Sequence, residues 1–384
     1  MLLDRLSAVP GFDELRATGS GLWLVGGAVR DALLGEPVRD LDVVVEGDAL
    51  AVARRLGEIV SEHERFGTAE VRLPGSGTKV NLASARTETY ARPGALPDVT
   101  LGATVEQDLQ RRDFTVNAMA VALDDGRELA APGARADLDA RRLRVLHDRS
   151  FVDDPTRILR MVRYAQRLGF DPDAATAQLA RAAVADKALL TVTRDRIAGE
   201  LRLALDEPDP LATLAAMHDW TAGATPRVDV ALARRAVALL PDARLDLLAV
   251  ASGAIGDERA ARRNIQWFDE SRPARRRAAE TAHADALARE LAAAPRPSEV
   301  VALARRRPPE MVALAGALGA EDVVRRYLSE LRHVALAIDG RDLLDAGVPE
   351  GPEIRAALER ALAARLDGTI APGRESELRA ALDG

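Results

Sequence analysis

The chain of 384 residues contains no cysteine. Disulfide bonds, thiolate nucleophiles and cysteine-ligated zinc are therefore excluded. The five histidines are scattered, which argues against a histidine-based metal cluster. No apolar run approaches the roughly twenty residues that span a bilayer, and the N-terminus lacks a basic region followed by an apolar core. We therefore expect a cytoplasmic protein with no membrane partner.

Lysine is nearly absent, with only Lys79 and Lys187, so arginine carries the positive charge. The net charge of −7 argues at first against a nucleic-acid partner. The arginines cluster, however, late in the chain, at Arg259, Arg262, Arg263, Arg272, Arg275, Arg276, Arg277, Arg305, Arg306, Arg307, Arg325, Arg326 and Arg332. On helices these clusters either contact a phosphate backbone or form solvated faces that pair with nearby acids. Composition leaves both interpretations open.

The N-terminal part mixes short β-rich runs with helices. We expect strands over residues 22–25, 41–45, 69–73, 78–82 and 118–122, and helices over 28–34, 50–59 and 105–109. A turn at residues 74–77 predicts an antiparallel pair of the strands on either side, and a turn at residues 124–126 predicts a hairpin toward residues 128–130. The polar, proline-broken segment 86–105 is too long for an ordinary turn, so we expect a mobile loop there.

After Pro155 the strand signals end, and Ala/Leu/Arg-rich segments with helical spacing continue to the C-terminus. The length of the chain and its apolar content of 47% allow one large core, but favour two to four smaller ones. The predicted fold class is therefore α+β, with an N-terminal head built on a mixed or antiparallel sheet, followed by an all-α region.

Two glycines, Gly26 and Gly27, end the first expected strand and lead into a helix. Backbone N–H groups at such a turn are free to bind a phosphate, and the helix dipole favours an anion there. Arg30, one turn into the helix, can add a positive charge. A Gly-Gly turn alone is more often only a turn.

Asp40 and Asp42 lie one residue apart at the start of the second expected strand, and we expect both side chains on one face. Two carboxylates so placed repel each other unless a cation lies between them. Hard oxygen ligands suit Mg²⁺, and two such ions can bind both the attacking and the leaving oxygen of a nucleotidyl transfer. The alternative for either residue is a solvated strand position.

The segment from Val25 to Gly35, followed by Asp40-Leu41-Asp42, closely resembles the first motif of the bacterial-type (class II) tRNA nucleotidyltransferases and poly(A) polymerases. Residues 111–119, Arg-Arg-Asp-Phe-Thr-Val-Asn-Ala-Met, resemble the second motif of that family, and residues 146–160 resemble a later one. Residues 338–344 and Gly351-Pro352 are similar to its tail segment. The resemblance covers almost the whole chain and is weakest between about residues 205 and 330.

The resemblance implies roles for individual residues. Asp40 and Asp42 would hold Mg²⁺, and Gly26, Gly27 and Arg30 the triphosphate. Arg112 and Asp113 would hold the ribose with help from Asn117, the alternative being a buried ion pair at a helix start. Asp154 and Arg157 would read the base edge of CTP or ATP, the alternative being an intrahelical salt bridge. Arg160 and Arg163 continue that face and can bind phosphates.

The resemblance also implies an organisation and an activity. It predicts a catalytic nucleotidyltransferase head over residues 1–145, a helical neck over 146–205 that recognises the base, a helical body over 206–330 and a helical tail over 331–384 that binds tRNA. The implied activity is CCA addition to tRNA from CTP and ATP. Addition of only the terminal AMP, poly(A) polymerase activity and a catalytically inactive RNA-binding role remain as alternatives.

One position departs from the family pattern. Asn81 stands on an expected strand where relatives usually have a carboxylate. An amide carries no negative charge, although its carbonyl oxygen can still ligate a cation. No sustained heptad pattern predicts an oligomer, so the oligomeric state stays open.

Overall fold

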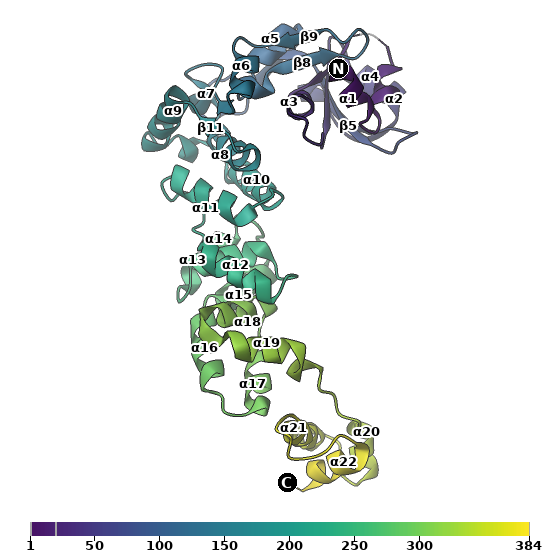
Figure 1. Ribbon diagram of the computed structural model, residues 1–384, viewed down its shortest axis with the longest axis vertical. Helices are drawn as coiled ribbons and strands as arrows, with labels where there is room; N and C mark the ends of the chain where they lie inside the picture. Colours follow the sequence, from purple (N-terminus) through teal and green to yellow (C-terminus); the bar gives the residue numbers. More distant parts are fainter. Residues whose placement is uncertain (1, 20, 384) are drawn as a thin grey trace. The chain divides into compact units, whose positions relative to one another are not determined.

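The computed structural model describes residues 2–19 and 21–383. The chain divides into two compact units, the first made of residues 1–200 with 220–222 and the second of residues 201–219 with 223–384. The labelled strands lie in the purple-to-teal N-terminal part of the chain in Figure 1, and the green-to-yellow part is built from helices. The predicted α+β fold class, a mixed-sheet head followed by a helical region, is confirmed.

The first unit is organised around a seven-stranded sheet with the strand order β3-β4-β5-β2-β1-β8-β9. Its strands are β1 Leu22–Val25, β2 Leu41–Val45, β3 Glu58–His63, β4 Thr68–Arg72, β5 Lys79–Ser84, β8 Met119–Ala122 and β9 Glu128–Ala130. Only β2 and β5 run parallel; the other neighbours are antiparallel, so the sheet is mixed. Both predicted antiparallel pairs, β4 with β5 and β8 with β9, are present.

The two faces of the sheet bury alternate residues of each strand, as the two-residue period requires. Leu24 and Val43 belong to the larger core, which α3 (Gly27–Leu34) and α4 (Ala49–Leu56) help to cover. Val25 and Val44 point to the opposite core, together with residues of α5 (Val105–Gln110). Asp42 has the same parity as Val44, so it lies on the second face, beside the end of β1.

The remaining helices of this unit include those that carry the later motifs. They are α1 Leu2–Ser7, α2 Phe12–Arg16, α6 Ala134–Asp139, α7 Ser150–Asp153, α8 Thr156–Leu168, α9 Ala174–Ala185 and α10 Arg194–Leu205. Two short 3₁₀ turns, η2 (Thr115–Asn117) and η3 (Ala188–Thr191), lie close to the site described below.

Three expectations from the sequence were wrong in detail. The helix expected over 50–59 ends at Leu56, because Gly57 stops it and the β-branched pair Ile59-Val60 continues as the edge strand β3. The segment 86–105 is not a loop throughout: β6 (Arg86–Thr89) pairs antiparallel with β7 (Asp98–Leu101), and Thr87 lies opposite Thr100. Strands also do not end at Pro155, because β11 (Asp171–Pro172) pairs parallel with β10 (Arg142–Leu143).

The second unit is helical and contains several apolar clusters. Its helices are α11 Pro210–Trp220, α12 Val230–Leu239, α13 Leu245–Gly253, α14 Glu258–Ile265, α15 Arg272–Thr281, α16 Ala284–Ala293, α17 Pro297–Ala304, α18 Pro309–Ala315, α19 Glu321–Ser329, α20 Gly340–Asp345, α21 Pro352–Leu366 and α22 Arg374–Leu382. Helices α20 to α22 share a small cluster of their own, centred on Leu343, Ala357 and Ala381. None of the helices described for residues 2–19 and 21–383 is long and apolar enough to cross a membrane.

Candidate active site

The Gly-Gly turn lies where β1 ends and α3 begins. Gly26 has φ +67° and ψ −126°, a conformation that residues with a Cβ rarely adopt. A Cβ placed there would lie 2.9 Å from Arg112 Nη1, so the guanidinium rests directly against the turn. Position 26 therefore requires glycine for two reasons: its backbone conformation and the Arg112 side chain packed against it.

Asp42 projects from β2 beside Asn81 of β5. The two residues are in register on parallel strands, and Asn81 Nδ2 donates a hydrogen bond of 3.0 Å to Asp42 Oδ1. Asp40 is exposed and directly precedes β2, instead of forming its first residue. Within residues 2–19 and 21–383 there is no cluster of three or more carboxylate, histidine or cysteine side chains that could hold a metal ion. A cation here would therefore depend on the two aspartates and on neutral oxygens.

A buried network links the first motif to the second. Arg30 is only 2% exposed; its guanidinium lies 2.7 Å from Asp31 Oδ1 and donates to Asn117 Oδ1. Asn117 Nδ2 in turn donates to Asp113 Oδ1 at 3.0 Å. Arg30 is enclosed by protein partners, so in this conformation it orients Asn117.

Asp113 is the charged centre of this network. Besides Asn117, it accepts a hydrogen bond of 2.8 Å from Arg160 Nε. Burial alone would raise the pKa of Asp113, but the positive charge of Arg160 and the hydrogen bond from Asn117 outweigh it and lower the pKa to about 2. Asp113 is therefore ionised at neutral pH and holds both partners in place.

Arg112 combines a fixed position with an unused donor. Its Nη2 lies 3.1 Å from the fully buried carboxylate of Asp108, four residues earlier. Its Nε is buried and has no hydrogen-bond partner in the described part of the chain. A buried donor without a partner is costly unless a ligand satisfies it. The guanidinium is thus placed to donate to an anionic or hydroxyl-bearing ligand above the Gly-Gly turn.

Asp154 and Arg157 flank the start of α8, but they do not form an intrahelical salt bridge with each other. Asp154 precedes the helix; its Oδ1 accepts from the backbone N–H of Thr156 at 3.0 Å and pairs with Arg196 at 2.7 Å. Arg157 is nearly buried and donates to Ser150 Oγ and to the Arg111 carbonyl, each at 2.7 Å. Each side chain is held by a different set of partners.

Arg160 and Arg163 continue along α8 with different surroundings. Arg160 is partly exposed and, besides Asp113, donates to the Tyr164 hydroxyl at 2.8 Å. Arg163 is buried and pairs with Glu200 of α10 at 2.7 Å. Arg160 can therefore also reach a ligand, whereas Arg163 fastens α8 to α10.

These elements enclose a pocket of about 480 Å³ in the first unit. Nine of the predicted site residues line it, namely Gly26, Gly27, Asp42, Arg112, Asp113, Asn117, Asp154, Arg157 and Arg160. Arg30 and Arg163 are buried behind the lining, and Asp40 lies at the exposed start of β2. The volume and the paired carboxylates and guanidinium groups suit a charged, polar ligand.

Sequence reasoning missed several lining residues, among them Glu88, Tyr90, Arg111 and Arg196. Glu88 accepts from Arg111 at 2.9 Å and from the Tyr90 hydroxyl at 3.1 Å. Burial, and then the nearby Glu88, raise the pKa of Tyr90 to about 12, so its hydroxyl keeps its proton and donates. Arg196 comes from α10, 42 positions after Asp154, and no local pattern marks it.

Comparisons with known proteins agree with this geometry. Residues 22–144 match the poly(A) polymerase head domain. An A-adding tRNA nucleotidyltransferase of Geobacter sulfurreducens is 34% identical over 94% of this chain and 45% of that protein. A CC-adding tRNA nucleotidyltransferase of Deinococcus radiodurans is 42% identical over 53% of this chain and 54% of that protein.

A solved structure extends the similarity along the chain. The Thermotoga maritima CCA-adding enzyme complexed with tRNA is 29% identical, with a TM-score of 0.78 over 99% of this chain and 94% of that one. The chain is thus similar along its length to tRNA nucleotidyltransferases, and its residues 22–144 match a poly(A) polymerase head domain. It spans about half the length of the curated relatives it matches. Within the matched residues lie the Gly-Gly turn, Asp42, Asp113 and Asn117, whereas Asp154, Arg196 and the Arg160 that pairs with Asp113 lie beyond residue 144.

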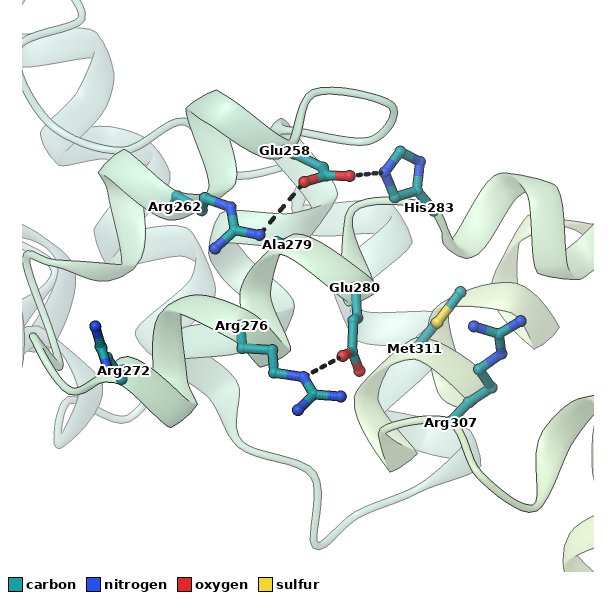
Figure 2. Close-up of a pocket in the computed structure, with 9 residues that line it drawn as sticks. All are labelled: Glu258, Arg262, Arg272, Arg276, Ala279, Glu280, His283, Arg307 and Met311. Carbon is teal, nitrogen blue, oxygen red and sulfur yellow. Dashed lines mark hydrogen bonds and ion pairs between the residues drawn. The ribbon is translucent and has the colours of Figure 1, made fainter.

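The second unit contains another pocket, of about 560 Å³, lined by four arginines (Figure 2). Arg276 pairs with Glu280 at 2.8 Å, and Arg262 with Glu258 at 3.5 Å, which is the solvated-face arrangement weighed for the arginine clusters. In the described chain no ion pair is found for Arg272 or Arg307. Of the four arginines that line this pocket, these two are the ones available to an external anion.

Proposed function

We propose that this protein adds CMP and AMP to the 3′ end of tRNA, completing and repairing the CCA terminus. The observation that carries the proposal is that Asp42, the Gly-Gly turn and Asp154 line one and the same pocket. In this proposal they serve metal binding, phosphate binding and base reading. The names of the similar proteins, tRNA nucleotidyltransferases and a CCA-adding enzyme bound to tRNA, support the same activity.

In this proposal the nucleotide is held at three places. The Gly26 N–H donates to the Met119 carbonyl at 3.0 Å, so the Gly27 N–H at the start of α3, with Arg112, binds the triphosphate and ribose. The buried Arg30 acts through Asn117. Asp113, ionised and fixed by Arg160, accepts from a ribose hydroxyl. The side chains of Asp154 and Arg157 read the base: the carboxylate accepts from the exocyclic amine that cytosine and adenine share, and the guanidinium donates to a ring acceptor.

The reaction joins the 3′ oxygen of the tRNA to the α-phosphorus, breaks the bond to the β-phosphate and releases pyrophosphate, and the hydroxyl proton goes to solvent. Family members use a divalent metal, and we propose Mg²⁺. The oxygens of Asp42 and Asp40, with neutral oxygens beside them, are a hard donor set that fits this ion. Bound there, it would supply charge neutralisation at the phosphates. The protein itself contributes mainly positioning.

We further propose the organisation expected from the resemblance: a head over residues 1–145, a base-recognising neck over 146–205, a body over 206–330 and a tRNA-binding tail over 331–384. A cytoplasmic location follows from the substrate proposed. One alternative activity has an observation in its favour. The relative from Geobacter is named an A-adding enzyme, so addition of the terminal AMP alone is the second candidate.

Incorporation of labelled nucleotides tests both candidates. The purified protein is incubated with Mg²⁺, CTP or ATP, and tRNAs that end at the discriminator base, at C or at CC. CCA addition predicts CMP incorporation on the two shorter tRNAs and AMP on the third. AMP on the CC tRNA alone would assign the A-adding activity.

The variant Asp42→Ala tests the catalytic assignment. We expect incorporation to fall about 1,000-fold, since a metal ion contributes several kcal/mol and each 1.4 kcal/mol is a factor of ten. Asp139→Asn, an exposed acid at the end of α6, serves as the matched control and should keep full activity. Failure of the wild-type protein to add any nucleotide to any of the three tRNAs would refute the proposed function.

A further inference from the structure

The two carboxylate oxygens of Asp154 differ in their hydrogen bonds. Its Oδ1 accepts from the Thr156 backbone N–H at 3.0 Å and from the Thr156 hydroxyl at 2.6 Å, and it lies 2.7 Å from Arg196 Nη2. Among the described residues no hydrogen bond or ion pair is recorded for Oδ2, and the side chain is 18% exposed at the pocket. Three donors therefore fix the carboxylate plane and leave Oδ2 as the acceptor available to a base.

Arg196 contributes the only charge among these three donors, and it has a second contact. Its Nη1 donates to the carbonyl of Gly94 at 3.1 Å. Gly94 belongs to the segment between β6 and β7, so one guanidinium joins that segment, helix α10 and the carboxylate before α8.

The segment between β6 and β7 packs closely against the rest of the unit at Gly94. The Gly94 N–H points to the Asp153 carbonyl at 3.2 Å and to the Val152 carbonyl at 3.3 Å. Gly94 has φ +69°, and a Cβ there would lie 2.1 Å from Thr191 Oγ1. No side chain larger than hydrogen fits, so the backbone of the segment lies directly on η3 and on the residues before Asp154.

We infer that Arg196 is a specificity-determining positioning residue, which holds the Asp154 carboxylate in its base-reading orientation and couples that orientation to the docking of residues 90–97 through the Gly94 carbonyl. The inference rests on the proposed function, because it assumes that Asp154 reads the base. Cytosine and adenine present an amine at the exocyclic position, whereas uracil and guanine present a carbonyl oxygen that a fixed carboxylate would repel.

The first test uses Arg196→Gln, with equilibrium binding of CTP and UTP as the readout and incorporation of each as a second one. We expect the preference for CTP over UTP to fall at least about tenfold, the size of one lost base contact, because an untethered carboxylate can turn away. Arg149→Gln is the matched control: Arg149 forms an exposed ion pair with Asp153, one residue from Asp154, and lies outside the pocket lining. It should leave the preference unchanged.

The second test uses Gly94→Ala. The new Cβ should displace the docked segment, while the side chains of Arg196 and Asp154 themselves stay unchanged. We expect the same loss of preference, and we expect the double variant to show no further loss, because both changes break one connection. The thermal midpoint of each variant is measured in parallel. If Arg196→Gln does not fold, Arg196→Lys, which keeps the charge but cannot serve both acceptors with one planar group, replaces it.

The outcomes separate the inference from the proposed function. An unchanged CTP preference in folded Arg196→Gln would overturn the inference, and fully additive effects in the double variant would overturn the coupling to Gly94. A wild-type protein that binds CTP and UTP equally would overturn it too, since no base reading would exist to be positioned. A wild-type protein that prefers CTP in binding but adds no nucleotide to tRNA would refute the proposed function alone.

Discussion

Asn81 is the in-register neighbour of Asp42 across the parallel strands β2 and β5, and the two side chains are joined by a hydrogen bond of 3.0 Å. An amide thus stands where a second carboxylate would directly face the first. The amide donor stabilises the charge of Asp42 without a cation, and a carboxylate at the same place would need one.

The variant Asn81→Asp should therefore make stability depend on Mg²⁺. Without a cation, repulsion worth about one pKa unit, about 1.4 kcal/mol, should lower the thermal midpoint by roughly 3 °C. Added Mg²⁺ should restore it, because the ion binds between the two carboxylates. Melting curves with EDTA and with Mg²⁺ measure the effect. Asn81→Ala, which adds no charge, is the control, and an equal response of both variants to Mg²⁺ would contradict the prediction.

Asp113 should contribute to stability in a pH-dependent way. Its pKa falls from 3.8 to about 2 in the folded protein, because the charge of Arg160 and the hydrogen bond from Asn117 outweigh the effect of burial. Since the folded pKa is the lower one, the contribution of about 2 kcal/mol is present above pH 4 and is lost as the pH falls toward 2.

Unfolding in urea at pH 7, 5, 4 and 3 tests this for the wild type and for Asp113→Asn. The difference in unfolding free energy should be largest at neutral pH and should shrink below pH 4. A difference that stays constant down to pH 3 would show that the ionisation of Asp113 is not its source.

Gly26 and Gly27 should respond differently to the same substitution. Gly26→Ala should cost about 1–3 kcal/mol for the strained backbone and should displace Arg112, whose Nη1 would lie 2.9 Å from the new Cβ. Gly27 is helical, and its Cβ would make ordinary contacts with Arg30 at 3.5 Å, so Gly27→Ala should be neutral or slightly stabilising. Urea unfolding compares the two; an equal loss of stability in both would argue against the special role of the Gly26 conformation.

The same displacement of Arg112 should weaken nucleotide binding without regard to the base. We expect Gly26→Ala to raise the dissociation constants of CTP and ATP by the same factor, since the triphosphate and ribose are common to both. A change confined to one nucleotide would instead tie Gly26 to base selection.

Arg272 and Arg307 line the pocket of the second unit and form no ion pair within the described residues (Figure 2), which gives a prediction about RNA binding. If both contact phosphates, Arg307→Ala and Arg272→Ala should each reduce the slope of log affinity against log salt for tRNA by about one. Arg289→Ala removes an exposed arginine that pairs with Asp285 on α16 and is the control. Filter binding at several salt concentrations measures the slopes; unchanged slopes for Arg272 and Arg307 would exclude phosphate contact in this pocket.

Much of the head could be predicted because its signals are local. The strand from Leu22 to Val25, the glycines after it and the helix to Leu34 follow from neighbouring residues, and the strand from Leu41 to Val45 was predicted to the residue. The hairpin β6–β7 was missed because its alternation is carried by threonines and charged residues and not by apolar ones. The two strands are held together by backbone hydrogen bonds, and these do not require a pattern of apolar residues in the sequence.

The partners of the site residues were less accessible to sequence reasoning. The spacing of Asp154 and Arg157 predicted that they act as a pair. In the structure Asp154 is paired with Arg196, and Arg157 donates to the Arg111 carbonyl. Such contacts join residues 40 or more positions apart, and nothing in the local pattern specifies them. Arg30 illustrates the same limit, because only the fold shows that Asn117, 87 positions later, encloses its charge.

The match to the poly(A) polymerase head ends at residue 144, ten positions before Asp154. Asp42, proposed to bind the metal ion, and Asp154, proposed to read the base, thus lie on different sides of the end of this match. A chimera in which residues 145–200 are exchanged between two relatives should therefore take its preference for CTP or ATP from the protein that donates this segment. Its nucleotidyl transfer should still depend on the head of the recipient.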